Sequence, residues 1–106
     1  MLIHTEQKDG FTVQFFALEP DDCILNDENM QPDDARAIQD KIDSGEYVHF
    51  IARIVVSKAG IELASEYLGS CIYNSYMEFV EIECYYQDMI KTAIDEAKEF
   101  ILLLNK

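Results

Sequence analysis

Acidic side chains are the residues of this sequence with the greatest potential for binding or chemistry. Between Glu19 and Glu46 the sequence has ten acidic residues and only two basic ones, Arg36 and Lys41, so this segment has a net charge of −8. Over all 106 residues, 21 Asp and Glu oppose 8 Lys and Arg, which gives −13. Nucleic acids and anionic membranes repel such a surface, so we expect a basic partner and no direct contact with nucleic acid or membrane.

The acidic segment has two interpretations. It can be an ordinary solvated loop and helix face. Alternatively, its carboxylates can imitate the phosphates of a nucleic acid and bind the Arg and Lys array of a basic groove, as charge-assisted hydrogen bonds allow. The candidate contacts are Asp21, Asp22, Asp27, Glu28, Asp33 and Asp34.

Motifs for metal binding and catalysis are weak. The acids of residues 21–28 could ligate calcium, but an EF-hand loop needs oxygens at alternate positions, a Gly at the sixth and a Glu at the twelfth, and these do not occur in register. The two histidines are far apart in the sequence, and no nucleophile motif or phosphate-binding glycine loop occurs. We expect a protein without metal or cofactor that is not an enzyme. Paired carboxylates leave no readable spacing, so an enzyme is a third alternative.

Tyrosines are concentrated in one region, since five of the six lie between residues 67 and 86. Most are expected in the core. Tyrosine also combines an apolar ring with a polar tip and is enriched at interfaces. Tyr76, Tyr85 and Tyr86 are therefore candidates for contact with a partner or with a second copy in a homodimer.

Three segments have the composition of strands, rich in β-branched and aromatic residues or alternating between two faces. The third follows the second after a short connection that contains Gly60, which indicates an antiparallel hairpin. On the outer face of this hairpin, Arg53 can pair with Glu62 or Glu66. The three segments are residues 11–18, 47–57 and 61–68.

Two regions have a helical period. Pro32 suits the first position of a short helix that Gly45 is placed to end. Ser75 and Glu78 form a capping box ahead of a long apolar stripe with three-four spacing. The sequence leaves open whether residues 75–106 form one helix or two. The prediction is one α+β domain over residues 1–106, in the order β-α-β-β-α, with a mostly antiparallel three-stranded sheet and helices packed on one face.

The compartment is predicted from what the sequence lacks. It shows no signal-peptide pattern and no apolar run of membrane-spanning length. Cys23, Cys71 and Cys84 are odd in number and lack metal-binding spacing, which favours reduced thiols. We expect a cytoplasmic protein of a bacterial host.

The C-terminal half contains a distinctive series of segments: 60–73, with a Tyr-Leu-Gly turn, then Tyr76-Met77-Glu78-Phe79 and Tyr85-Tyr86-Gln87-Asp88-Met89-Ile90. In these segments it resembles small uncharacterised proteins encoded by bacteriophages and prophages. The acidic N-terminal half lies outside the match. The resemblance implies a phage or mobile-element origin, where small acidic proteins are often inhibitors of host defence such as anti-CRISPR proteins.

The leading functional hypothesis is a non-catalytic inhibitor of a host defence against foreign DNA. Its acidic surface would bind the basic nucleic-acid-binding site of a host protein or protein–nucleic acid complex. The alternative is a phage accessory protein that associates with itself or with another phage protein through a Tyr- and Met-rich helical surface, its acidity serving solubility alone.

Overall fold

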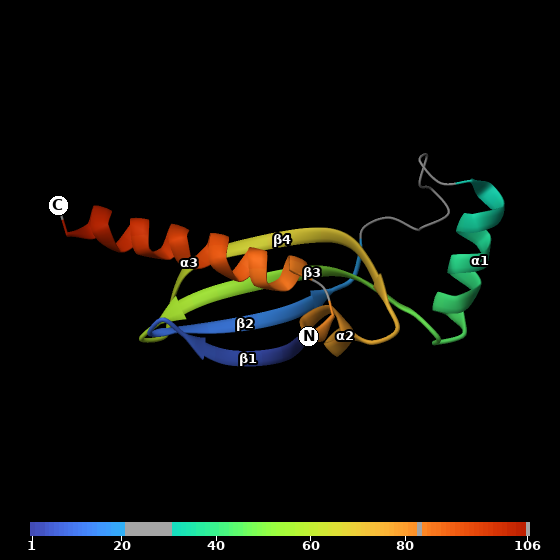
Figure 1. Ribbon diagram of the computed structural model, residues 1–106, viewed down its shortest axis with the longest axis horizontal. Helices are drawn as coiled ribbons and strands as arrows, with labels where there is room; N and C mark the ends of the chain where they lie inside the picture. Colours follow the sequence, from blue (N-terminus) through green and yellow to red (C-terminus); the bar gives the residue numbers. More distant parts are fainter. Residues whose placement is uncertain (21–30, 83, 106) are drawn as a thin grey trace.

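The fold is a four-stranded antiparallel sheet in the order β1-β2-β3-β4, with two helices across one face (Figure 1). The computed structural model describes residues 1–20, 31–82 and 84–105. The molecule is elongated, with extents of 55 × 24 × 21 Å. Its elements are β1 (Leu2–Lys8), β2 (Phe11–Leu18), α1 (Pro32–Asp43), β3 (Val48–Lys58), β4 (Ile61–Tyr73), α2 (Tyr76–Glu81) and α3 (Cys84–Leu104).

The α+β class is confirmed, but the predicted three-stranded sheet and the order β-α-β-β-α are wrong. The sheet contains an additional first strand, β1, which pairs with β2 through a two-residue turn at Asp9 and Gly10. Both turn residues have positive φ, 54° and 84°, as the type I′ hairpin turn requires. The last strand also continues through residues 69–73, beyond the predicted end at residue 68.

The core lies between the sheet and α3. Alternate residues of β2 and β3 face the helix, and Phe15 at the centre has no exposed surface. Its ring lies 5.2 Å from Phe79 and 6.0 Å from both Phe50 and Tyr86, measured between ring centroids. Because this cluster joins two strands to both helices, replacing Phe15 with Ala is expected to cost about 3–5 kcal/mol.

Residues 75–106 contain two helices rather than one. The Ser75 side chain accepts a 3.2 Å hydrogen bond from the Glu78 backbone N–H, which confirms the predicted N-cap of α2. The helix ends at Ile82, and α3 then runs for 21 residues across β3 and β4. Its buried residues have the expected helical spacing: Tyr86, Ile90, Ala93, Ile94 and Ala97.

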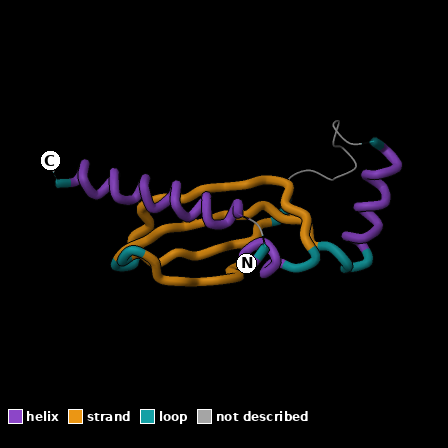
Figure 2. Tube along the Cα trace, viewed as in Figure 1, coloured by secondary structure: helices purple, strands orange, loops and turns teal. Residues whose placement is uncertain are grey.

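Helix α1 begins at Pro32 as predicted but does not pack on the sheet with the others (Figure 2). It stands beyond the end of β2 and β3, and no α1 residue belongs to the main core cluster. Ala35 is its only buried residue. The prediction that the helices share one face therefore holds for α2 and α3 and is wrong for α1.

Candidate binding surface

The second face of the sheet, here called the open face, has no described helix over it (Figure 2). Strand residues point alternately to opposite faces, so the residues between the core positions of each strand lie here. In an antiparallel sheet with one solvated face these positions are normally polar. The half of the open face nearest α1 is instead apolar around Arg53. We call its residues the apolar patch: Leu2, Phe16, Leu18, Ile51, Val55 and Tyr67.

The strand register places these side chains in rows. Leu2, Phe16, Arg53 and Tyr67 are successive partners across all four strands. Leu18 pairs with Ile51 in the neighbouring row. Toward the two hairpin turns the rows are polar except for Val55, which pairs with Gln14 and Ser65. Their polar residues are Thr5, Gln7, Thr12, Gln14, Ser57 and Ser65.

Arg53 is held in the middle of the apolar patch. Its guanidinium lies 5.8 Å from the Phe16 ring centroid and 5.7 Å from the Tyr67 ring centroid. One terminal nitrogen, Nη2, donates a 3.0 Å hydrogen bond to Glu62, the pairing predicted as one of two choices. The buried Nε has no hydrogen-bond partner among the described residues. Arg53 is therefore fixed by two rings and one carboxylate.

The apolar patch is close to neutral in a chain of charge −13. Arg53 and Glu62 offset each other. Burial lowers the pKa of His49, so the imidazole at the end of the patch is neutral at pH 7. Tyr67 is 57% exposed, whereas Val55 is only 5% exposed because its neighbours on the face cover it. The apolar patch therefore exposes the Tyr67 ring to solvent, while Val55 is covered.

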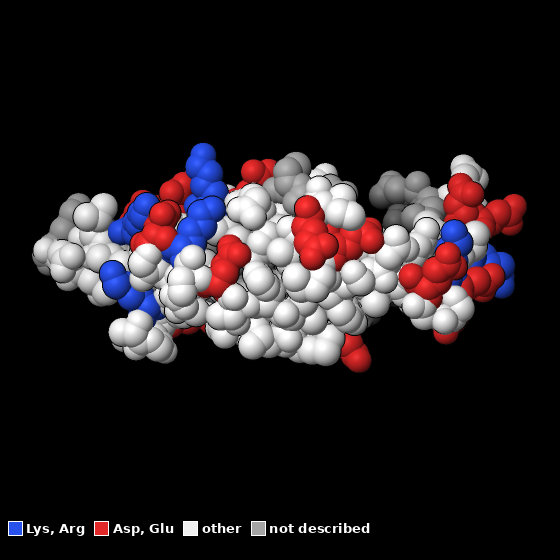
Figure 3. Space-filling model, turned by 60° about the horizontal axis from the view of Figure 1, so that its bottom comes forward, with Lys and Arg blue, Asp and Glu red and all other residues white. Residues whose placement is uncertain are grey.

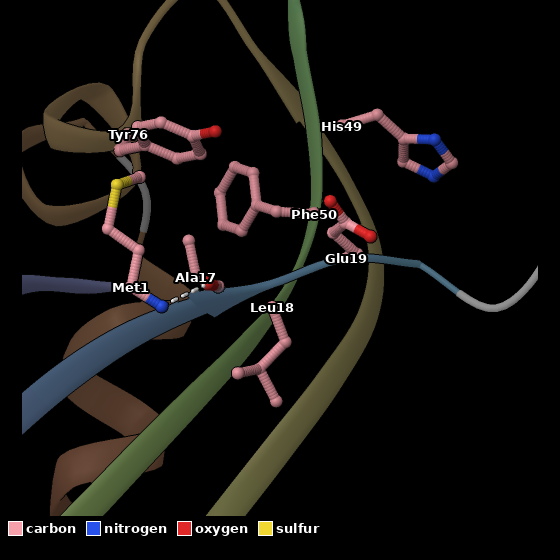
Figure 4. A pocket seen from close by; sticks show the side chains of 7 residues that line it. All are labelled: Met1, Ala17, Leu18, Glu19, His49, Phe50 and Tyr76. Atoms are coloured by element: carbon pink, nitrogen blue, oxygen red, sulfur yellow. Dashed lines mark hydrogen bonds between the residues drawn. The ribbon is translucent and has the colours of Figure 1, made fainter.

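A pocket of about 380 Å³ lies at the end of β2 and β3 beside the apolar patch (Figure 4). In this view His49 and Phe50 project to opposite sides of β3, with Tyr76 and Met1 on the Phe50 side. The pocket is therefore lined by side chains from both sides of β3. Its lining residues are Met1, Ala17, Leu18, Glu19, His49, Phe50 and Tyr76.

Carboxylates meet at one other place in the described structure. A side-chain hydrogen bond with Glu96 on α3 raises the pKa of Glu66 on β4, and burial and the negative charge of Glu96 raise it further. Glu66 thus faces α3 and is not the partner of Arg53. In the described parts of the chain, no three His, Cys, Asp or Glu side chains are grouped so that they could hold a metal ion.

The structure describes two of the six predicted acidic contact residues. Asp33 and Asp34 are exposed in the first turn of α1, and Figure 3 shows acidic side chains crowded on this lobe. Asp21, Asp22, Asp27 and Glu28 lie outside the described residues.

The three candidate tyrosines do not form one surface. Tyr76 is half-buried, with its ring 5.2 Å from that of Phe50, and Tyr85 is 53% exposed. Tyr86 has no exposed surface, because it fills the core beneath α3, so it has no area to offer a partner.

The apolar patch was missed from sequence, although a signal was present. In 47–57 both alternating sets are apolar, with Ile51 and Val55 on the side opposite Phe50 and Ile54. A strand that is apolar on both sides is typical of a sheet covered on both faces. The long strand β3 therefore indicates a second apolar contact surface.

Fold and surface define an α+β protein with one covered and one open sheet face. Comparisons with protein-family models, curated proteins and solved structures found no match to the chain. None of the described helices combines the length and apolar character needed to cross a membrane.

Proposed function

We propose that the protein is a non-enzymatic binding protein that holds an apolar, basic segment of another polypeptide on the apolar patch. The supporting observation is the row Leu2–Phe16–Arg53–Tyr67, which runs across all four strands without a described covering element. Apolar surface of this continuity on a polar-rimmed face marks interaction sites.

The partner chemistry follows from charge. A net charge of −13 attracts basic segments and accelerates their encounter. Glu19 is an exposed carboxylate beside the apolar patch and can meet Lys or Arg of the partner. Apolar side chains of the same segment then lie against Phe16 and Tyr67. Because Arg53 already stacks on both rings, the surface changes little on binding, which limits the entropic cost.

Fluorescence anisotropy with labelled decapeptides tests this proposal. A peptide of alternating Leu and Lys should bind, whereas a peptide of alternating Ser and Lys, with the same charge, should bind at least tenfold more weakly. The double variant Ile51→Thr/Tyr67→Thr should lose binding by a similar factor, because each change removes apolar area while keeping a strand-compatible residue.

The matched control is Gln14→Thr, which lies on the polar half of the same face and should leave the affinity unchanged. Equal binding of the Leu–Lys and Ser–Lys peptides would reduce the interaction to charge alone and contradict the proposal.

A second candidate is the acidic inhibitor of a host nucleic-acid-directed defence complex. The observation that favours it is the position of α1, which holds Asp33, Asp34, Asp40 and Asp43 exposed and clear of the sheet. A purified CRISPR effector provides the probe, with its binding to target DNA followed by gel shift.

In this candidate the four-fold Asp→Asn variant of α1 loses inhibition, and inhibition by the natural chain weakens steeply with salt. A control with Asp88→Asn/Asp95→Asn on α3 keeps it. Undiminished inhibition by the α1 variant excludes α1 as the contact.

A further inference from the structure

The charge of Arg53 is the feature of the apolar patch that apolar contact alone does not explain. Its side chain is 29% exposed, so part of it faces solvent in the middle of the patch. Any segment bound across the patch covers this part and removes water from it. Taking water from a cation is unfavourable unless new contacts replace it. The partner must therefore supply a group that interacts with a guanidinium.

A carboxylate of the partner is a poor choice for this group. Nη2 of Arg53 already donates a hydrogen bond to Glu62, so the pair is neutral before a partner binds. A second carboxylate would lie beside Glu62 and give the site a net negative charge. A chain of charge −13 also repels an acidic segment. Backbone carbonyl oxygens can accept from the guanidinium, but every peptide has them, so they do not select among partners.

Aromatic rings already flank Arg53 within the chain. The Phe16 and Tyr67 centroids lie 5.8 and 5.7 Å from the guanidinium carbon, within the range at which the face of a ring attracts a cation. A ring does so without adding a negative charge beside Glu62. It also adds apolar area next to Tyr67, which is 57% exposed. A ring from the partner therefore suits both the cation and the apolar side chains around it.

We propose that Arg53 is a specificity-determining residue that selects segments with an aromatic side chain. The inference rests on the proposed function and defines the partner more closely, as Phe, Tyr or Trp flanked by Lys or Arg. In the complex the aromatic ring of the partner lies over the exposed part of Arg53, between Phe16 and Tyr67. The flanking cations remain near the carboxylates of the chain.

Two peptides that differ only in aromaticity test this selection. Both keep the Leu–Lys design, with every Leu replaced by Phe in one peptide and by cyclohexylalanine in the other. The two side chains have nearly the same shape, but the saturated ring has no π face. Fluorescence anisotropy gives the ratio of the two affinities. This ratio is compared between the natural chain and Arg53→Met, whose unbranched side chain can still lie between the two rings.

The preference for the Phe peptide should fall about two- to fivefold in Arg53→Met, the size of one cation–π contact at a partly exposed site. Loss of the positive charge affects both Lys-containing peptides alike, so the ratio isolates the contact with the ring. The matched control is Lys58→Met. It removes the same charge and one cation–π contact, to Phe11 at 5.5 Å, at the hairpin turn outside the apolar patch. It should leave the ratio unchanged.

Nuclear magnetic resonance provides a second measurement that needs no variant. The ring current of a Phe stacked on Arg53 should move the side-chain resonances of this residue upfield in the natural chain. The cyclohexylalanine peptide should not produce this shift, because its ring carries no ring current. Equal shifts with the two peptides would place the aromatic ring elsewhere and contradict the proposal.

An affinity ratio that is the same in the natural chain and in folded Arg53→Met also overturns the proposal. Binding of the Leu–Lys peptide separates this failure from that of the proposed function. If the Leu–Lys peptide binds and the ratio does not change, only the aromatic selection is wrong. If the natural chain binds none of the three peptides, the proposed function is wrong as well.

Discussion

Tyr86 shows how a core can hold a polar group that nothing in the described structure satisfies. The ring is completely buried, and its hydroxyl has no hydrogen-bond partner among the described residues. Burial also raises the pKa of this hydroxyl far above its usual range, with a smaller effect of the charge on Glu6. The hydroxyl of Tyr86 is therefore protonated at pH 7.

Replacing Tyr86 with Phe should raise the free energy of unfolding by about 1 kcal/mol, because it removes an unpaired buried hydroxyl and keeps the ring. Urea denaturation at pH 7 measures this. Tyr85→Phe, at an exposed position, is the control and should change nothing. A loss of stability in Tyr86→Phe would mean that the hydroxyl has a partner in solution.

Glu66 gives the stability a dependence on pH. Its raised pKa means that the folded chain binds this proton more tightly than the unfolded chain. The contribution is complete at pH values below the unfolded pKa and is lost as pH rises through the folded pKa. Glu66→Gln should therefore flatten the dependence of stability on pH above pH 4. It should raise the free energy of unfolding by at most about 0.5 kcal/mol at pH 7, because solvent screens a pair with Glu66 half-buried and Glu96 exposed.

Thermal unfolding between pH 4 and pH 7 measures the effect of Glu66→Gln. In the natural chain the Glu66 carboxylate makes the fold less stable than Gln does as pH rises. The control Glu46→Gln, an exposed position between α1 and β3 and outside the Glu66–Glu96 pair, should follow the natural profile. Parallel profiles for Glu66→Gln and the natural chain would show that the two carboxylates do not share a proton.

At the scale of elements, the two hairpin turns share one backbone conformation. Ala59 and Gly60 connect β3 and β4 with positive φ of 54° and 80°, the same pattern as Asp9 and Gly10. Ala is poor in this conformation, whose cost for a residue with a Cβ is about 1–2 kcal/mol. Asn tolerates it, and Asn-Gly is the preferred type I′ pair.

Ala59→Asn should therefore stabilise the protein by about 1 kcal/mol, which raises Tm by about 4–8 °C in a domain of this size. Differential scanning calorimetry gives both values. Ala37→Asn, at an exposed position in α1, is the control and should stabilise nothing, because Asn is a weaker helix former than Ala. No gain at Ala59 would show that its backbone adopts another conformation in solution.

Local signals predicted most elements. β2 begins and ends at the predicted residues, Pro32 opens α1, and Ser75 caps α2. β1 was missed because its polar residues weaken the strand pattern, although Asp9-Gly10 is a strong hairpin signal. The length of β4 was missed because Gly69 indicated a turn, whereas the strand accommodates its neighbours through an irregular register opposite Phe50 and Ala52.

The candidate surfaces depend on pairings that the sequence does not contain. The apolar patch joins residues 2, 16, 53 and 67, which only the strand register brings into one row. The apolar spacing of α3 continues as far as Leu104, but the helix extends past the end of the sheet, so Leu104 is 67% exposed (Figure 1). In both cases exposure depends on strand pairing and on the length of the sheet, which a local sequence pattern does not contain.

At the scale of the whole molecule, α1 and the sheet are nearly independent in energy. The buried hydrophobic cluster contains side chains of β2, β3, β4, α2 and α3, but none of α1. Because burial of apolar area provides most of the stability, α1 contributes little of it. Its acids thus contribute charge at one end of a 55 Å molecule, and the C-terminal end of α3 lies at the other.

Replacing residues 32–43 with a Gly/Ser linker of equal length should therefore leave one cooperative unfolding transition, with Tm lowered by less than about 5 °C, equivalent to roughly 1 kcal/mol. The affinity of the apolar patch for the Leu–Lys peptide should fall only because negative charge is removed. At high salt the affinity of the linker variant should equal that of the natural chain. The inhibitor activity of the second candidate should disappear. Loss of cooperative unfolding would contradict this division, because it would require contacts between α1 and the core that the described structure lacks.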